Sequence, residues 1–230
     1  MKNKVSVLFM LTGILFAACL LLSNILASKI MMIGPWSAPA GVLIFPLAYI
    51  INDVLVEVWG YQKTRLIIWA GFGVNVLAVL FFTLAISVTA APFWQNQDAF
   101  TTVLGSTPRI VAASMLAYLL GSFLNAYVMS KFKVLTKGKG FSIRAILSTL
   151  VGEGADSLIF ISIAFAGLFP VKVILGMIVT QALMKTVYEI AVLPLTIWTV
   201  NKVKKMEGID TFDYSVSYNP FRLKQIENAN

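Results

Sequence analysis

The chain has 230 residues, of which 59% are hydrophobic and 12% charged, and its mean hydropathy is +0.86. Soluble domains carry about 25% charged residues, so this composition indicates an integral membrane protein. A net charge of +8 would suggest a nucleic-acid partner in a soluble protein, but here the basic residues follow a membrane topology. The absence of histidine and the single cysteine exclude histidine-based catalysis, histidine metal sites and intramolecular disulfides.

Six hydrophobic runs are long enough to cross about 30 Å of hydrocarbon as α-helices. They lie at Val5–Ser28, Ala40–Trp59, Leu66–Ala91, Arg109–Ser130, Ile143–Leu168 and Val171–Val200. The first run resembles a signal sequence, but it continues past Cys19, so we expect an uncleaved helix. We therefore predict an all-α membrane protein with a six-helix transmembrane domain over residues 1–205. The polar segment 206–230 is expected to be a loosely held tail.

The segments between the runs divide the chain into two halves. Gly60–Arg65 is a short basic turn, Pro92–Pro108 is the longest loop, and the basic loop Lys131–Ser142 separates two groups of three helices. An odd number of helices in each half gives the halves opposite orientations. This arrangement suits two inverted three-helix repeats, a recurring transporter design.

Basic residues are distributed unequally between the two sides of the membrane. With a cytoplasmic N-terminus, the outer segments hold Lys29, Arg109 and Lys172, and Lys185 lies within the last helix. The other 14 lie on the inner side: Lys2, Lys4, Lys63, Arg65, Lys131, Lys133, Lys137, Lys139, Arg144, Lys202, Lys204, Lys205, Arg222 and Lys224. The positive-inside rule therefore places both termini in the cytoplasm.

Polar side chains interrupt the hydrophobic runs, although a charge near the bilayer centre costs at least about 2.5–3.5 kcal/mol. Residues three or four apart share a helix face, so these side chains form polar stripes on the second, fourth, fifth and sixth helices. One-sided stripes on apolar helices indicate a polar cavity inside a bundle. The predicted substrate-binding residues are Asn24, Asp53, Glu57, Asn75, Asn125, Glu153, Asp156, Lys185 and Glu189.

A structural role for these residues is the alternative. Lys185 could pair with Glu189 one turn away, or with an acid on a neighbouring helix, and the asparagines could join helices. The acids of the second helix could pair with the basic turn that follows it. One lysine does not neutralise five carboxylates, however, which favours a binding site. Glu153 and Asp156 lie deepest and are the preferred ligands.

The chemistry of such a cavity suits a small planar solute with several N–H donors, or a cation. A carboxylate accepts two parallel hydrogen bonds from an edge such as the ring N–H and exocyclic amine of a guanine-like base. Any proton coupling must run through carboxylates, and Glu153 and Asp156 are the candidate couple. Aromatic side chains could stack on the solute, although most aromatics in membrane proteins pack or lie at interfaces: Trp59, Tyr118, Phe160 and Tyr188.

Gly152 and Gly154 flank Glu153, and two interpretations stay open. They could mark a break in the helix, or they could allow a close approach of neighbouring helices. The chain has no nucleotide-binding, nucleophile-elbow or zinc motif, so we expect no ATP-driven step within it, no cofactor and no metal.

Several short motifs follow one another along the chain. They are Ser23-Asn24-Ile25-Leu26-Ala27-Ser28-Lys29, Asn52-Asp53, Glu57-Val58-Trp59-Gly60-Tyr61, Thr64-Arg65, Asn75, Arg144, Gly152-Glu153, Asp156-Ser157, Asp213-Tyr214 and Asn219-Pro220-Phe221. Together they resemble the queuosine precursor transporter family, also called the vitamin uptake transporter family. The resemblance covers nearly the whole chain.

The resemblance implies an importer in the bacterial inner membrane that carries 7-deazaguanine precursors of queuosine, or queuine, and is not an enzyme. Its expected partners are a purine-like solute and the lipid bilayer, without nucleic acid, and the sequence leaves a homodimer open. Two other functions stay open. The chain could be the substrate-binding subunit of an ATP-driven uptake system, or an intramembrane enzyme that uses a carboxylate pair.

Overall fold

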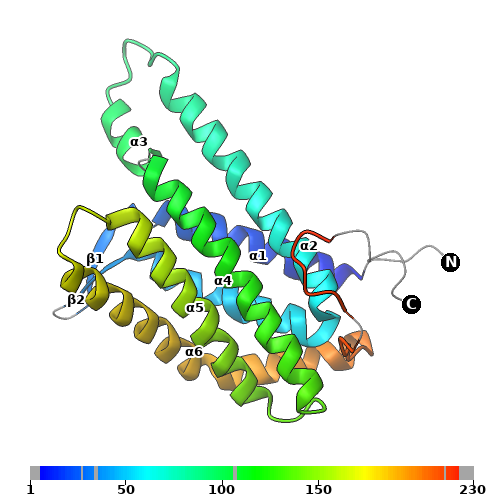
Figure 1. Ribbon diagram of the computed structural model, residues 1–230. Helices are drawn as coiled ribbons and strands as arrows, with labels where there is room; N and C mark the ends of the chain where they lie inside the picture. Colours follow the sequence, from blue (N-terminus) through cyan, green and yellow to red (C-terminus); the bar gives the residue numbers. More distant parts are fainter. Residues whose placement is uncertain (1–5, 27, 34–35, 106–107, 215, 223–230) are drawn as a thin grey trace.

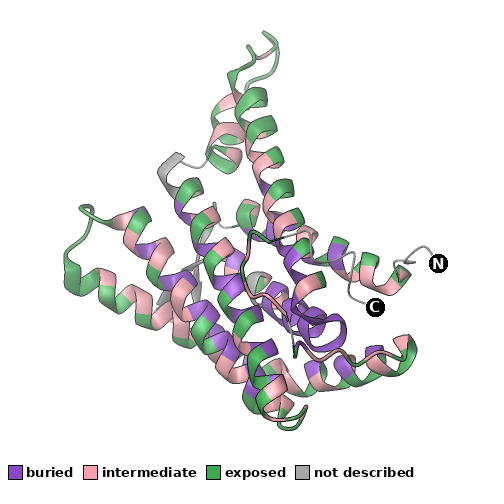
Figure 2. Cartoon of the chain, turned by 45° about the vertical axis from the view of Figure 1, so that its right-hand side comes forward, coloured by how far each residue is buried: buried purple, intermediate pink, exposed green. Residues whose placement is uncertain are grey.

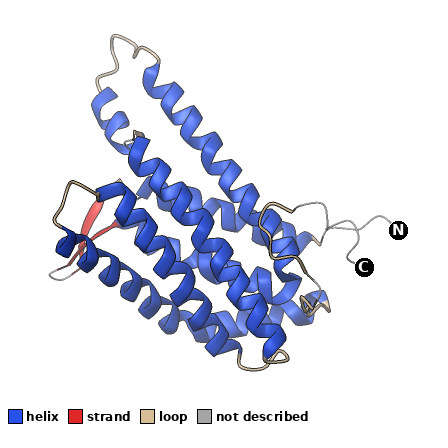
Figure 3. Ribbon diagram, in the orientation of Figure 1, coloured by secondary structure: helices blue, strands red, loops and turns tan. Residues whose placement is uncertain are grey.

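The computed structural model describes residues 6–222 except 27, 34–35, 106–107 and 215. Its helices are α1 (Val7–Leu26), α2 (Phe45–Ser87), α3 (Gln97–Leu104), α4 (Pro108–Leu135), α5 (Phe141–Phe165) and α6 (Val171–Glu207). Strands β1 (Ile30–Ile33) and β2 (Trp36–Pro39) pair antiparallel, and a 3-10 turn (Ala40–Leu43) precedes α2. Figures 1 and 3 show a helical bundle with this small strand pair at its edge. Lys2, Lys4, Ala27 and Lys224 lie outside the described residues.

Among the described residues, α1, α2, α4, α5 and α6 are long and apolar enough to cross a membrane. Large apolar side chains such as Leu80, Leu150 and Leu183 face outward, as contact with lipid requires. Buried residues gather where the helices cross, whereas the far end of α2 and most of α6 carry exposed and intermediate residues (Figure 2). The predicted all-α membrane fold is confirmed, while the inverted repeat stays a prediction.

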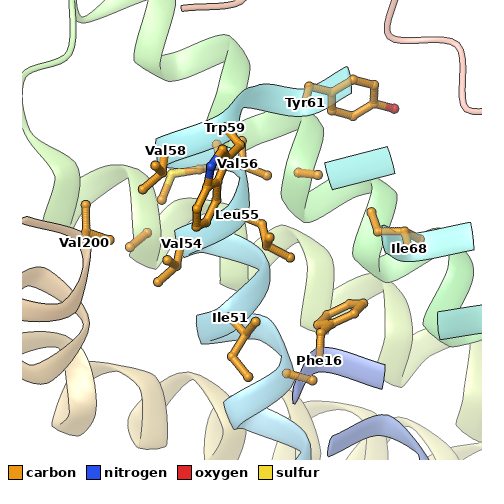
Figure 4. Packing of buried hydrophobic residues seen from close by; sticks show 14 of the residues in the cluster. Phe16, Ile51, Val54, Leu55, Val56, Val58, Trp59, Tyr61, Ile68 and Val200 are labelled. Carbon is orange, nitrogen blue, oxygen red and sulfur yellow. The ribbon is translucent and has the colours of Figure 1, made fainter. Parts of the chain in front are cut away.

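Helix α2 contains two of the six predicted runs. A straight helix of its 43 residues would be about 65 Å long, roughly twice the hydrocarbon thickness. The helix is broken at Gly60, where φ is 82° and ψ is 168°, a conformation open to glycine and strained for other residues. Its two arms leave the break in different directions (Figure 1). Figure 4 shows Trp59 and Tyr61 pointing apart on the two sides of the break.

Helices α4 and α5 approach closely at a pair of glycines. A Cβ on Gly121 would lie 2.9 Å from the Gly152 carbonyl oxygen and 2.4 Å from the Tyr49 hydroxyl. A Cβ on Gly152 would lie 2.7 Å from the Asn125 Cβ. Helix α5 continues unbroken through both Gly152 and Gly154, so the break interpretation is wrong and close packing explains Gly152. This approach holds the polar faces of α2, α4 and α5 together.

The described part of the tail is not loosely held, contrary to the sequence-based expectation. Its backbone returns to the break in α2, where the Thr211 N–H donates to the Val58 carbonyl at 3.2 Å. Asp213 Oδ2 accepts from the Tyr61 N–H at 2.9 Å and from the Ser130 hydroxyl at 2.5 Å. Asp213 therefore caps the first free N–H after the break, as an N-cap residue does at the start of a helix.

Further along the tail, two side chains of α2 bind backbone carbonyls. Arg65 Nη1 donates to the carbonyls of Ser217 at 3.2 Å and Asn219 at 2.6 Å, and Trp69 Nε1 donates to Pro220 at 2.9 Å. The polar composition of the tail suggested solvent exposure. It instead supplies carbonyl groups to basic and aromatic donors on the second arm of α2.

Candidate functional site

The structure divides the predicted polar residues into four groups. Glu57 belongs to an ionic cluster, hereafter the Glu57 cluster, formed with Lys133, Arg144, Lys204 and Asp210. Lys185 joins Glu153 and Asp156 in the Lys185 triad. Asp53 and Glu189, hereafter the acid pair, are the two remaining predicted acids, and both are buried. Asn24 and Asn75 meet elsewhere, and Asn125 lies beside the acid pair.

The Glu57 cluster occupies the end of the bundle where α4 ends, α5 begins and α6 ends. Arg144 binds Glu57 with two parallel hydrogen bonds, Nη1 to Oε2 at 2.5 Å and Nη2 to Oε1 at 3.1 Å. Lys204 Nζ lies 2.7 Å from Glu57 Oε1, and Lys133 Nζ lies 3.6 Å from the same oxygen. Bidentate, charge-assisted bonds of this kind are strong, and they fill both oxygens of Glu57.

Asp210 extends this cluster to the tail. Its Oδ1 lies 2.5 Å from Lys133 Nζ and 2.9 Å from Lys204 Nζ. Burial alone would raise the pKa of Asp210, but hydrogen bonds from the two lysines hold that pKa below its usual value. The cluster therefore ties α2, α4, α5 and α6 to the start of the tail.

The Lys185 triad lies in the middle of the bundle. Glu153 is twelve residues into α5, about 18 Å along a helix of roughly 37 Å. Lys185 Nζ lies 2.7 Å from Asp156 Oδ2 and 3.1 Å from Glu153 Oε2, and all three side chains are buried. Lys185 thus pairs with acids on the neighbouring helix, one of the two predicted possibilities.

Lys185 does not occupy every hydrogen-bond acceptor at the triad. Glu153 Oε1 is buried and, among the described residues, has no hydrogen-bond partner, and the same is true of the Ser157 hydroxyl one turn further along. The Tyr49 ring lies against Gly121 and Gly152, beside the two acids. Buried acceptors in native proteins are nearly always hydrogen-bonded, so these atoms mark a place where a ligand's donors fit.

The acid pair consists of Asp53 on α2 and Glu189 on α6. Asp53 is 0% exposed and Glu189 is 3% exposed, and no described lysine or arginine lies within 4.0 Å of either carboxylate. The Ser148 hydroxyl donates to Asp53 Oδ1 at 3.4 Å. Asp53 Oδ2 and both oxygens of Glu189 have no partner in the part of the chain that the structure describes.

Amide side chains frame the acid pair on the side of α4. Asn52 Nδ2 donates to Asn125 Oδ1 at 2.8 Å and to the Ser122 carbonyl at 3.2 Å, which leaves Asn125 Nδ2 facing the pair. The Thr149 hydroxyl, which faces Glu189 from α5, also has no hydrogen-bond partner among the described residues.

Asn24 and Asn75 lie apart from these acids. Asn24 Nδ2 donates to Asn75 Oδ1 at 2.5 Å, and the Ser114 hydroxyl donates to Asn24 Oδ1 at 3.2 Å. They line a small pocket between α1, α2 and α4 with Leu20, Ser114, Met115 and Tyr118. The asparagines therefore join α1 to the second arm of α2, which agrees with the helix-joining alternative.

Sequence reasoning missed some partners of the acids and misplaced some aromatics. Ser148 and Thr149 lie one turn before Glu153, so extending its stripe along the helix would have found them. Nothing in the sequence pattern pointed to Lys204 as a partner of Glu57. Trp59 packs against Phe9 in the core, and Tyr188 is 37% exposed, so neither lines the site.

The chain is similar to known membrane transport proteins. The family model described as "Putative vitamin uptake transporter" matches residues 39–199. The chain belongs to this family. The match includes Lys185 and the five carboxylates predicted to bind substrate, whereas Asn24, Lys204 and Asp210 lie outside it. Membership makes the chain a multi-pass membrane transporter, not an enzyme.

Curated relatives have consistent names. The chain is 27% identical to a "Probable queuosine precursor transporter" of Bacillus subtilis over 75% of this chain and 76% of the relative. It is 30% identical to the "Queuosine precursor transporter" of Escherichia coli over 54% of each chain. A Haemophilus influenzae relative is 29% identical over 54% of this chain, so the matches span about half of the latter two proteins. No solved structure matches the chain significantly.

Proposed function

We propose that the chain imports queuosine precursors, 7-deazaguanine bases or queuine, across the bacterial inner membrane, with both termini in the cytoplasm. Three relatives at 27–30% identity carry the name of such a transporter. The basic residues of the Glu57 cluster lie at the end that the positive-inside rule assigns to the cytoplasm.

The Lys185 triad is the proposed substrate site. The observation that carries this proposal is the unpartnered Glu153 Oε1, buried halfway along α5 beside Tyr49. A guanine-like base presents a ring N–H and an exocyclic amine, which match the acceptor geometry of a carboxylate. Tyr49 supplies an aromatic face at the same place. Lys185 pairs with Glu153 and Asp156 and leaves Glu153 Oε1 as an acceptor for the base.

Transport by alternating access then requires the cytoplasmic end to open. The Glu57 cluster and the docked tail close that end, because they join α2, α4, α5 and α6. Opening would separate the partners of Glu57 while the substrate remains on the triad. The cluster thereby acts as the inner gate of the proposed cycle.

The test is rescue of queuosine-modified tRNA in a strain that depends on an added precursor base. Wild-type protein should restore the modification, and Glu153→Gln, which preserves shape but removes charge, should lower uptake about tenfold or more. Asp98→Asn, an exposed acid on α3, is the matched control and should transport normally. Equal rescue by Glu153→Gln would reject the substrate site.

Uptake by the purified chain alone in proteoliposomes separates the proposal from its alternative. Transport without any other protein supports a self-sufficient importer. Uptake that appears only after addition of an ATP-hydrolysing partner would identify the chain as a substrate-binding subunit.

A further inference from the structure

Arg65, on the second arm of α2, is a buried cation that forms no salt bridge with any described carboxylate. Its side chain is 0% exposed. The other buried basic residues, Lys133, Arg144 and Lys185, each pair with at least one acid. The Tyr61 ring centroid lies 5.9 Å from the Arg65 guanidinium carbon, a cation–π contact that brings no negative charge. Burial of a charge without a counterion is costly, so Arg65 indicates a site for an anion.

The hydrogen bonds of Arg65 leave one edge of its guanidinium group unused. Nη1 donates to two carbonyls of the tail, those of Ser217 and Asn219. Nε and Nη2 are buried and, in the part of the chain that the structure describes, have no hydrogen-bond partner. The N–H groups of these two nitrogens point the same way in the plane of the guanidinium. They therefore fit two oxygens of a single phosphate or carboxylate group.

The place of Arg65 in the fold favours phosphate. It follows the break at Gly60, at the end of the bundle that the positive-inside rule assigns to the cytoplasm. Trp69, one turn further along the same helix face, is half-buried and donates its indole N–H to the Pro220 carbonyl. The Phe221 ring packs on Trp69 with ring centroids 5.6 Å apart and is 73% exposed. Aromatic side chains of this kind are typical of the membrane interface, where phospholipid phosphates lie.

The cover over Arg65 is thin. In Figure 1 the tail, drawn in red, passes beside the start of the second arm of α2. Asn219 is exposed and Ser217 is half-buried, although both bind Arg65 through their carbonyls. A small outward shift of this stretch would expose the unused edge. The Arg222 N–H donates to the Asn219 carbonyl at 3.3 Å, which brings a second, exposed cation near the same place.

We propose that the Nε–Nη2 edge of Arg65 binds a phosphate group at the cytoplasmic surface, carried by a phospholipid headgroup or present as free phosphate. The bound phosphate supplies the counterion that the described residues do not provide, while Nη1 keeps its bonds to the tail. The site goes beyond the proposed function, because it holds no transported base and shares no residue with the Lys185 triad.

The test measures binding to the delipidated full-length protein in a neutral detergent. The probes are dioleoylphosphatidylglycerol, dioleoylglycerol, which has the same acyl chains without the phosphate, and inorganic phosphate. Lipid retention is followed by native mass spectrometry, and each probe is also scored by the rise in melting temperature that a bound ligand causes. Wild type should retain the phospholipid and not dioleoylglycerol. Arg65→Gln should bind the phospholipid at least about tenfold more weakly, because it loses hydrogen bonds between charged groups.

Three further variants separate phosphate binding from docking of the tail. Arg65→Lys keeps the charge without the planar fork and should also bind more weakly, which provides the comparison if Arg65→Gln does not fold. Trp69→Phe removes a hydrogen bond to the tail but leaves the guanidinium intact, and Lys63→Gln removes an exposed cation of the same arm. Both should bind phospholipid as wild type does.

The probes identify the source of the phosphate. Stabilisation by phosphatidylglycerol alone supports a lipid headgroup at Arg65, and stabilisation by inorganic phosphate as well supports a site that also takes the free anion. Equal binding by wild type and both Arg65 variants would overturn the proposal, as would equal retention of dioleoylglycerol and phospholipid or no retention of either. Loss of binding in Trp69→Phe to the level of Arg65→Gln would also overturn it, because docking of the tail would then explain the effect.

Discussion

Glu57 and Glu153 are each 1% exposed, but the charges around them differ. Glu57 lies among three basic side chains that fill both of its oxygens. In the middle of the bundle, Glu153 shares Lys185 with Asp156, and the acid pair nearby has no cation among the described residues. Buried acids thus serve two purposes in this chain. Those saturated by cations hold helices together, and those left short of cations are available to a ligand or a proton.

Removal of the Glu57 charge should give the largest loss of stability. Glu57→Gln leaves three buried or half-buried cations without their shared carboxylate, and breaking a buried ion pair costs about 3–5 kcal/mol. We expect a clear fall in the thermal unfolding midpoint in detergent, followed by tryptophan fluorescence. Glu189→Gln is the matched comparison and should unfold no earlier than wild type. Equal destabilisation by the two substitutions would contradict the distinction between the Glu57 cluster and the mid-bundle acids.

The substitution Lys185→Met should give the second-largest loss of stability. It leaves Glu153 and Asp156 without a cation, and we expect the free energy of unfolding to fall by about 2–4 kcal/mol. This loss is smaller than that of Glu57→Gln because a buried carboxylate can take up a proton. The double variant Lys185→Met/Asp156→Asn should recover part of the loss, since it removes one stranded acid. A double variant no more stable than Lys185→Met alone would show that the pairing contributes nothing.

Gly121→Ala tests the helix approach that positions the triad. Its Cβ would meet the Tyr49 hydroxyl and the Gly152 carbonyl, and overpacking of this kind costs about 1–3 kcal/mol. Substrate binding should weaken as well, because Tyr49 must shift. Gly154→Ala is the control on the same helix pair, since no atom lies within 4 Å of its Cβ and alanine favours helix. Equal melting temperatures for the two variants would contradict the packing argument.

Asp213→Ala should have the smallest effect. It removes the cap on the Tyr61 N–H, and loss of a capping side chain costs about 0.5–2 kcal/mol. The tail should become more accessible, so limited proteolysis near residue 213 should accelerate in the variant, with Tyr214→Ala, an exposed neighbour, as control. Unchanged cleavage would mean that the carboxylate does not hold the tail.

Composition and run length were sufficient to predict the membrane fold, because the cost of burying polar backbone in lipid leaves few alternatives. They also predicted a turn at Gly60–Arg65 between the two arms of α2, but only Gly60 is non-helical and residues 61–65 already belong to the second arm. Helical pitch grouped Glu153 with Asp156 and Lys185 with Glu189, since pitch is a local property. It did not tell Glu57 from Glu153. That difference depends on Arg144 and Lys204, which approach from distant segments, and no local pattern encodes such contacts.

The tail shows the same limit. Its polar residues are typical of an exposed segment, and the sequence offered no reason to join Asp213 to Tyr61, which follows the break and lies 152 residues earlier. Only the free N–H at Gly60–Tyr61 explains why a carboxylate belongs there. Asn24 and Asn75 were similarly predicted to bind substrate because single asparagines in apolar helices look alike, whether they join helices or bind a ligand.

The most direct test of the central claim is equilibrium binding of a labelled 7-deazaguanine base to the purified protein. We expect saturable binding by wild type, a Kd at least about tenfold weaker for Glu153→Gln, and an unchanged melting temperature for that variant. Asp98→Asn should bind as wild type does. A Kd for Glu153→Gln equal to that of wild type would contradict the claim that Glu153 of the Lys185 triad holds the substrate.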